Sequence, residues 1–358
     1  MPAGAVNFVV VGCGKVGWKH LQAIANLGGP ARLCGVCDTH AERKVRAAET
    51  FGVRAFSTVS ELVENCLRPD VTVVAVPTGH HAEVVQAVAP FSSVILVEKP
   101  MALRLQDCDA MMRAARSAGA QLFVAYQNRY NPPVQAAWRA VKAGSLGKPV
   151  LATARVRWCR RPEYYETEAW RGTWELDGGV VAQQGSHHLD LLFHLFGPVA
   201  EVQCRAATRL LPIEVEDTAV AVLRFASGAL GVFEATVAAR PSDLEGSISL
   251  LGSRGTVIIG GFHANELRTW AFEDKESEPP TAPEDDGEKT SHSNRALLLE
   301  DVVRTVVDGA VSAFLCSAEQ GRANVALIRA FYESAAQGGV SVQPGVLTAH
   351  SRLGERVV

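Results

Sequence analysis

The sequence predicts an α/β protein of two domains, a doubly wound parallel sheet followed by an α+β domain with a large, mostly antiparallel sheet. At 358 residues the chain is longer than one hydrophobic core usually supports. Up to about residue 125, apolar strand candidates alternate with helical segments, which is typical of a parallel sheet covered by helices. Beyond that point, long strand candidates are joined by short turns, which favours antiparallel pairing. We therefore expect domains at residues 1–126 and 127–358.

The composition argues against several functional classes. The net charge of -3 provides no basic field for a nucleic acid or an anionic membrane surface. No apolar run is long enough to span a bilayer, and the first seven residues lack the parts of an export signal, so we expect a cytoplasmic protein. The eight cysteines are scattered, which favours buried thiols over disulfides and gives no ligand set for a catalytic metal.

Residues 6–11 form an apolar, β-branched strand candidate that runs directly into a glycine-rich turn. The turn, GCGKVG at residues 12–17, matches the pattern G-x-G-x-x-G, and residues 18–26 have helical composition. Strand, glycine turn and helix in this order are typical of a dinucleotide site, because the glycines allow a tight turn and close approach of a pyrophosphate. The helix N-terminus adds partial positive charge beneath the phosphates. The expected cofactor contacts here are Gly12, Gly14, Lys15, Val16 and Gly17.

A second strand candidate, residues 32–37, ends in Asp38, which lies 21 residues after Gly17. A carboxylate at this distance accepts hydrogen bonds from the ribose hydroxyls of the cofactor and repels a 2′-phosphate. Thr39 and His40 follow it rather than an arginine. The sequence therefore predicts NAD rather than NADP. An N-cap on the next helix is the alternative role of Asp38, and the two roles are compatible.

Two further strand candidates lead into polar loops. Residues 71–76 precede the loop PTGHH (77–81), and residues 94–97 precede the loop EKP (98–100). An open α/β sheet binds its ligand at the carboxyl ends of its strands, so both loops are expected to face the cofactor. Taken alone, Lys99 would be interpreted as a lysine that points into water; the glycine turn makes it a candidate ligand contact. The residues expected at the cofactor are Pro77, Thr78, His81, Glu98 and Lys99.

The remaining elements are predicted from periodicity and turn residues. In the first half we expect helices at 40–51, 59–66 and 104–118 and a last strand at 121–125. In the second half we expect helices at 132–144, 189–196, 296–308 and 319–337 and strands at 150–159, 202–210, 219–225, 230–238, 247–251 and 256–259. The acidic, proline-bearing segment 273–289 is expected to be a solvated loop.

Several short motifs occur in a fixed order along most of the chain. They are the glycine turn, the PT and H of residues 77–81, EKP (98–100), YQNRY (126–130), GG (178–179), GSHHLD (185–190), EDT (216–218) and YES (332–334). As an ordered set they resemble the glucose–fructose oxidoreductase, inositol dehydrogenase and MocA family. The resemblance implies a Rossmann domain, an open-faced sheet domain, and NAD(P)-dependent chemistry at hydroxyl carbons of sugars, cyclitols and related compounds. It also implies a homodimer or homotetramer built through the exposed face of the sheet.

The stretch WRGTW (170–174), followed by Asp177, narrows the resemblance. It is similar to the branch containing the nucleotide-sugar 3-dehydrogenases that act on UDP-N-acetylglucosaminuronate, although other sugar dehydrogenases carry similar stretches. Gln183 departs from the family pattern, which usually has an acid four residues before the motif histidine. Because a glutamine cannot take a proton, proton transfer is left chiefly to His187.

The resemblance also implies individual roles. His187 would be the base for the hydroxyl proton, since an imidazole titrates near neutral pH. Lys99 would donate a hydrogen bond to the substrate oxygen and stabilise the negative charge that develops there. Without the resemblance, His187 would be interpreted as a structural histidine. Asn128, Trp170 and Arg171 complete the expected cofactor contacts; the expected substrate contacts are Lys99, Arg129, Tyr164, Tyr165, Gln183 and His187.

Three functions are compatible with the sequence. The first is an NAD-dependent dehydrogenase acting on a CH–OH group of a sugar or nucleotide sugar. The second is a cyclitol or free-sugar dehydrogenase, or a ketoreductase that runs the same chemistry in reverse. The third is a non-catalytic, dinucleotide-binding regulator, against which the presence of both Lys99 and His187 argues.

Overall fold

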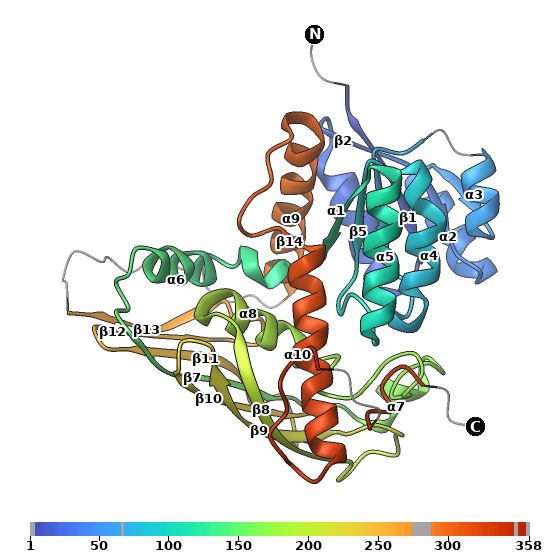
Figure 1. The fold of residues 1–358 in the computed structure, drawn as a ribbon. Coiled ribbons are helices and arrows are strands. Elements are labelled where there is room, and N and C mark those ends of the chain that lie inside the picture. The colour runs from blue at the N-terminus through green and yellow to red at the C-terminus, as the bar shows by residue number, and fades with distance from the viewer. Residues whose placement is uncertain (1–3, 66–67, 274–287, 347–349, 356–358) are drawn as a thin grey trace. The chain divides into compact units, whose positions relative to one another are not determined.

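The computed structural model describes residues 4–65, 68–273, 288–346 and 350–355 (Figure 1). The chain forms two compact units, one made of residues 1–127 and 291–322 and the other of residues 128–290 and 323–358. The predicted boundary after residue 126 lies one residue from a change of unit, but the segment 291–322 belongs to the first unit. The sequence pattern gives no sign of this return.

A seven-stranded sheet forms the centre of the first unit. In spatial order its strands are β14 (Cys316–Ser317), β6 (Gln121–Val124), β5 (Val94–Val97), β4 (Val71–Val74), β1 (Val6–Val11), β2 (Ala31–Cys37) and β3 (Arg54–Phe56). All neighbours are parallel except β14, which pairs antiparallel with β6. Strands β4 and β5 are buried at every position, as expected of β-branched runs covered on both faces. The predicted doubly wound parallel sheet is confirmed.

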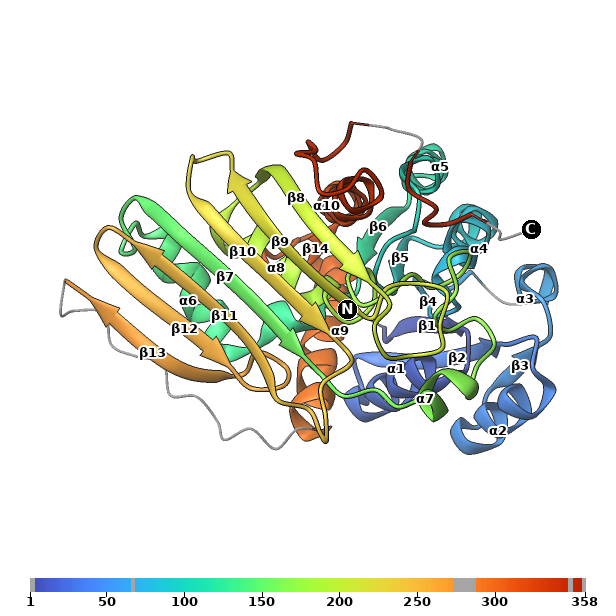
Figure 2. The same cartoon turned by 90° about the horizontal axis from the view of Figure 1, so that it is seen from below.

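Helices cover both faces of this sheet. Figure 2 shows α1 and α2 on one side of the strands and α4 and α5 on the other. In α5, the buried residues Leu105, Cys108, Met111 and Ala115 recur at intervals of three or four, which is the periodicity of an amphipathic helix. The helices of the first unit are α1 (Lys15–Leu27), α2 (Ala41–Phe51), α3 (Val59–Asn65), α4 (His81–Val88), α5 (Leu105–Ala118) and, from residue 291 on, α9 (Glu288–Asp308).

A second seven-stranded sheet forms the other unit. In spatial order its strands are β13 (Glu266–Phe272), β12 (Gly255–Gly260), β11 (Glu245–Gly252), β7 (Pro149–Arg157), β10 (Leu230–Thr236), β9 (Thr218–Phe225) and β8 (Val199–Ala207). Neighbouring strands are antiparallel except for β10 and β7. The predicted, mostly antiparallel sheet is therefore confirmed.

One face of the second sheet is covered by helices. These are α6 (Pro132–Lys142), α8 (Ser186–Phe196) and the part of α10 (Ala318–Ala336) that belongs to this unit; the short α7 (Pro162–Glu166) follows β7. Figure 2 looks onto the opposite face, over which none of these helices passes. Along β9 the buried residues alternate with exposed ones, and Val220 and Val222 are 51% and 54% exposed.

Several elements, among them β3, β13 and α9, differ from the sequence-based expectation. Strand β3 has three residues, too few for a recognisable pattern, and β13 combines polar with apolar residues. Most of the acidic segment 273–289 lies outside the described residues, but its last two residues begin α9 and do not belong to a loop. The polar run at 288–293 has no apolar periodicity, which is why the predicted helix starts too late. Among the described residues, no helix is long and apolar enough to cross a membrane.

Candidate active site

The glycine turn joins β1 to α1 in the first unit. Gly12 has a φ of 96°, and a Cβ on it would collide with the carbonyl oxygen of Ala75. A Cβ on Gly17 would collide with the Gly12 carbonyl oxygen, so both positions require glycine. Helix α1 begins at Lys15 and Val16, both exposed, and among the described residues no side chain caps its first amides. Those amides fit a dinucleotide pyrophosphate.

Asp38 follows β2 and is bound to the glycine turn. Its Oδ2 accepts a hydrogen bond from the Cys13 amide at 2.6 Å, and its Oδ1 accepts one from the His40 amide at 2.7 Å, in front of α2. The N-cap residue of α2 is His40, and among the described residues no side-chain hydrogen bond caps this helix, so the capping alternative for Asp38 is not supported. The place of Asp38 beside the turn fits the ribose role. Burial, followed by the Asp38 charge, raises the pKa of the Cys13 thiol to about 12, so this thiol stays protonated.

The loop after β4 is fixed by a buried histidine. Pro77 precedes the short 3-10 helix η1 (Thr78–His80), and the Thr78 side chain is buried. His81 places Nδ1 3.1 Å from the Met101 carbonyl oxygen and Nε2 3.0 Å from the Val76 carbonyl oxygen. Burial lowers the pKa of His81, so the neutral ring donates to one of these carbonyls. This geometry favours a positioning role for His81 over the expected cofactor contact.

Glu98 and Lys99 follow β5 in different environments. Glu98 is 7% exposed; its Oε1 lies 2.8 Å from Nε2 of His20 and 3.6 Å from Nη2 of Arg295. The other oxygen, Oε2, accepts a hydrogen bond from the Lys99 amide at 3.2 Å. Lys99 itself is partly exposed. Glu98 therefore supports the lysine from inside the unit, and of the two residues Lys99 is the better placed to meet a ligand.

The second unit carries the histidine pair at the start of α8. His187 is partly exposed, whereas His188 is fully buried. Burial, followed by the charge on His263, lowers the pKa of His188 to about 4, so His188 is neutral at physiological pH. Of the two, His187 is the more exposed side chain.

Arg129 and Asp190 form a buried ion pair in the second unit. Arg129 is 0% exposed, and its Nε and Nη2 donate to the two carboxylate oxygens of Asp190 at 2.8 and 2.6 Å. Asn324 donates a further hydrogen bond to Asp190 at 2.6 Å. This arrangement anchors α8 to the segment before α6, which favours a positioning role for Arg129 over the expected contact with an anionic sugar. Asn128, expected at the cofactor, is also buried.

Gln183 connects two loops of the second unit. Its Nε2 donates to the carbonyl oxygen of Asp177 at 2.9 Å, and Oδ2 of Asp177 accepts a hydrogen bond from the Gly172 amide at 2.6 Å. The WRGTW stretch is thereby joined to the segment that leads into α8 and His187. An ionised aspartate at position 183 has no N–H and cannot donate the first of these bonds. This is a structural reason for the departure from the usual family acid.

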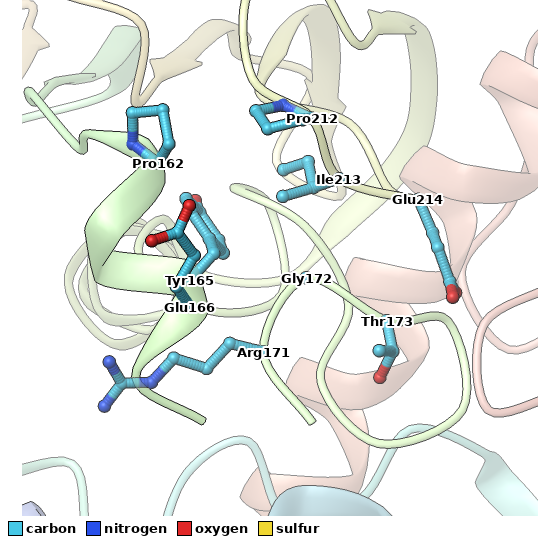
Figure 3. A pocket seen from close by; sticks show the side chains of 9 residues that line it. All are labelled: Pro162, Tyr165, Glu166, Arg171, Gly172, Thr173, Pro212, Ile213 and Glu214. Atoms are coloured by element: carbon cyan, nitrogen blue, oxygen red, sulfur yellow. The ribbon is translucent and has the colours of Figure 1, made fainter. Parts of the chain in front are cut away.

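A cavity of about 250 Å³ opens beside the WRGTW stretch, and Figure 3 shows its lining from close by. It brings together Tyr165 and Arg171, two of the expected site residues, but Gln183 and His187 do not line it. The Arg171 guanidinium lies 4.3 Å from the centre of the Tyr164 ring and donates to the Tyr164 carbonyl oxygen at 2.8 Å. The lining residues are Pro162, Tyr165, Glu166, Arg171, Gly172, Thr173, Pro212, Ile213 and Glu214.

Four buried residues received no individual role from the sequence: His20 and Arg295 in the first unit, and Glu216 and Tyr332 in the second. In the second unit, Oε1 of Glu216 accepts hydrogen bonds from the Val181 amide at 3.0 Å and from the Tyr332 hydroxyl at 2.8 Å. Glu216 and Tyr332 belong to motifs that carried the family resemblance, so their presence in those motifs was the available signal. Trp170 is partly exposed.

The described residues contain no group of three His, Cys, Asp or Glu side chains that could hold a metal ion. The absence of a catalytic metal stays a prediction.

Comparison with known proteins identifies the family. The model of the oxidoreductase family with an NAD-binding Rossmann fold matches residues 6–126, and the model of the GFO/IDH/MocA C-terminal domain matches residues 134–258. The WlbA dehydrogenase from Bordetella pertussis, crystallised with NADH and UDP-GlcNAcA, is 36% identical with a TM-score of 0.86; the match covers 96% of this chain and 98% of that one.

Two further relatives are more distant. D-apiose dehydrogenase from Paraburkholderia graminis is 28% identical, with 72% of this chain and 68% of the relative covered. Myo-inositol 2-dehydrogenase from Thermotoga maritima is 25% identical, with 82% of this chain and 98% of the relative covered. Together with a glycine turn shaped for a dinucleotide and the carboxylate of Asp38 beside it, these matches show that the chain belongs to the GFO/IDH/MocA family of NAD-dependent oxidoreductases.

Proposed function

We propose that this protein is an NAD-dependent dehydrogenase that oxidises a ring hydroxyl of a nucleotide sugar, as a 3-dehydrogenase does. The observation that carries the proposal is the 36% identity, over nearly the whole of both chains, to a WlbA dehydrogenase crystallised with UDP-GlcNAcA. The relatives that act on free sugars and cyclitols are 28% and 25% identical. The WRGTW stretch supports the same branch.

The chemistry assigns one step to each of two side chains. NAD, held at the glycine turn and Asp38, would supply the acceptor for the hydride of the carbon that carries the hydroxyl. The His187 imidazole takes the hydroxyl proton, which is consistent with its partial exposure at the first turn of α8. The Lys99 ammonium donates a hydrogen bond to the same oxygen and stabilises its developing negative charge. Gln183 acts through the loop that it holds, since its amide donates to the Asp177 carbonyl.

The cavity beside the WRGTW stretch supports a binding role for Tyr165 and Arg171. Its volume of about 250 Å³ is below the roughly 300–1,000 Å³ that is typical of small-molecule sites, so it suits part of a nucleotide sugar and not the whole molecule. The guanidinium of Arg171 can bind phosphate or carboxylate oxygens, and the phenol of Tyr165 can bind sugar hydroxyls.

A cyclitol or free-sugar dehydrogenase is the second candidate. It is favoured by the named relatives that act on D-apiose and myo-inositol. A direct assay separates the candidates: the protein is mixed with NAD and with UDP-GlcNAcA, UDP-GlcNAc, D-apiose or myo-inositol in turn, and NADH is followed by absorbance. We expect turnover with UDP-GlcNAcA and a product lighter by two hydrogens in mass spectrometry. Turnover with myo-inositol or D-apiose alone would replace the first candidate by the second.

We also propose a cytoplasmic homo-oligomer assembled through the bare face of the second sheet. On that face Val220 and Val222 of β9 are exposed. Leu230 and Val232 of β10 are exposed as well, by 55% and 36%. A contiguous apolar surface of this kind usually marks an interface. Light scattering should give a dimer or tetramer for the wild type and a smaller species for Val222→Asp. A monomeric wild type at micromolar concentration would refute the assembly.

A further inference from the structure

A cluster of buried ionisable side chains adjoins Lys99 in the first unit, and the proposed reaction does not use it. It joins His20 of α1, Glu98 at the end of β5 and Arg295 of α9, whose side chains are 0%, 9% and 4% exposed. His20 follows Gly17 by three residues, so the helix that starts at the glycine turn also carries the histidine that binds Glu98. Buried ionisable groups are costly unless they are paired, so this cluster requires an explanation.

The two acceptors of Glu98 are both occupied. Oε1 receives the Nε2 hydrogen of His20 at 2.8 Å, and Oε2 receives the backbone amide hydrogen of Lys99 at 3.2 Å. The guanidinium of Arg295 lies 3.6 Å from Oε1. The Glu98 side chain is therefore held at one end by His20 and holds the Lys99 backbone at the other.

The charge states in the cluster follow from burial and from these contacts. Burial, followed by the charge of Arg295, lowers the pKa of His20, so the ring is neutral and donates through Nε2. Among the described residues its Nδ1 has no hydrogen-bond partner, in keeping with an unprotonated nitrogen. Burial alone would raise the pKa of Glu98, but the His20 hydrogen bond and the charges of Arg295 and Lys99 outweigh it and bring this pKa far below its usual range.

We infer that His20 and Arg295 are positioning residues for Lys99: they keep Glu98 ionised and in one orientation, and Glu98 fixes the backbone from which the Lys99 side chain projects. Within the part of the chain that the structure describes, the charged and titratable groups that face Glu98 are His20, Arg295, Lys99 and the neutral His81. The inference rests on the proposed role of Lys99 in the reaction. A displacement of about 1 Å at a reacting group is enough to cost roughly a hundredfold in rate, so the orientation of Glu98 matters to turnover.

The test compares His20→Leu with His20→Gln, because glutamine can still donate a hydrogen to Glu98 and leucine cannot. Leu21→Ala is the matched control, since it removes packing from the same buried part of α1 without touching the charges. We expect His20→Leu to lower kcat roughly ten- to a hundredfold while the Kd for NADH, measured by fluorescence, changes little. His20→Gln should recover most of the loss, and Leu21→Ala should lower Tm with kcat nearly unchanged.

A second measurement needs no substrate. Lysines are methylated with ¹³C, and the Lys99 signal, identified by its absence from Lys99→Arg, is titrated by NMR in the full-length protein. We expect the midpoint of the Lys99 titration to move to lower pH in His20→Leu, because Glu98 then loses the donor that keeps it ionised and in one orientation beside Lys99. The midpoint should stay in place in His20→Gln and Leu21→Ala. If His20→Leu does not fold, Arg295→Met and Arg295→Lys provide a parallel comparison, in which the positive charge beside Glu98 is lost in the first variant and kept in the second.

The outcomes separate the inference from the proposed function. Wild-type turnover by Lys99→Ala would refute the role of Lys99 in the reaction, whatever the titration shows. An unmoved Lys99 titration in His20→Leu, or equal losses of kcat in His20→Leu, His20→Gln and Leu21→Ala, would refute the positioning role even where Lys99 is essential for turnover.

Discussion

Replacing Glu216 by glutamine should remove a specific part of the pH dependence of stability. Glu216 is 5% exposed, and burial is the main cause that raises the pKa of its carboxyl group from an ordinary 4.5 to about 7, against the hydrogen bonds from Val181 and Tyr332. The folded state therefore holds this proton more tightly than the unfolded state does. The stabilisation is fully present below about pH 4.5 and is lost as the pH rises through about 7.

The size of the effect follows from the two pKa values. A difference between 4.5 and about 7 corresponds to about 3 kcal/mol of unfolding free energy over the whole range. Between pH 5 and pH 8.5 the unfolding free energy of the wild type should fall by about 2 to 3 kcal/mol relative to that of Glu216→Gln, because the amide has no proton to lose in this range. The buried histidines titrate in both proteins, so their contributions cancel in the difference.

Urea unfolding followed by circular dichroism at several pH values measures this difference directly. The exposed carboxylate of Glu83, whose side chain is 84% exposed, provides the control, and Glu83→Gln should follow the wild-type curve. The reasoning fails if the Glu216→Gln and wild-type curves run parallel from pH 5 to pH 8.5, because Glu216 would then be ionised in the folded protein throughout.

The remaining predictions concern the cofactor, the reaction and the loops. Calorimetry should show that NAD binds more tightly than NADP, and that Asp38→Ala weakens NAD binding and reduces the difference between the two affinities. Equal affinities in the wild type would contradict the ribose role of Asp38. Lys99→Ala and His187→Ala should each lower turnover roughly 10²–10⁴-fold while calorimetry finds NAD still bound, and near-normal rates in either would rule out its role. Gln183→Asp should lower thermal stability by about 1–3 kcal/mol because it removes the donor to the Asp177 carbonyl, and an unchanged melt would argue against that bond. Chelators should leave turnover intact; a loss restored by one specific ion would overturn the prediction of metal-free catalysis.

The elements that the sequence predicts well are those whose pattern is local. Strands β1 and β5 match the predicted ranges because β1 is apolar apart from Asn7 and stops at Gly12, and β5 is apolar throughout and stops at Glu98. Strand β13 was missed because its pattern is mixed, and the pairing of β14 with β6 joins residues almost 200 positions apart. No local pattern encodes a contact at such a distance.

The residues of the candidate site also fall into those that a local sequence pattern reveals and those that it does not. The glycine turn and Asp38 can be identified from the sequence because cofactor binding imposes a fixed spacing on them. Arg129 was expected at the substrate because its charge suits an anionic sugar, and only the fold shows Asp190 against its guanidinium. His20 and Arg295 gave no signal at all, since what joins them is a carboxylate distant from both in sequence.

The two-part construction of the first unit has a consequence for synthesis on the ribosome. Residues 1–127 emerge first, but the unit is completed only by residues 291–322, of which β14 closes the edge of the sheet next to β6. At about 5–20 residues per second, this delay lasts roughly ten to forty seconds. During that time the backbone of β6 is an unpaired edge, the kind of surface on which chains aggregate. A released fragment that ends before residue 316 should therefore engage chaperones that the full 358-residue chain does not.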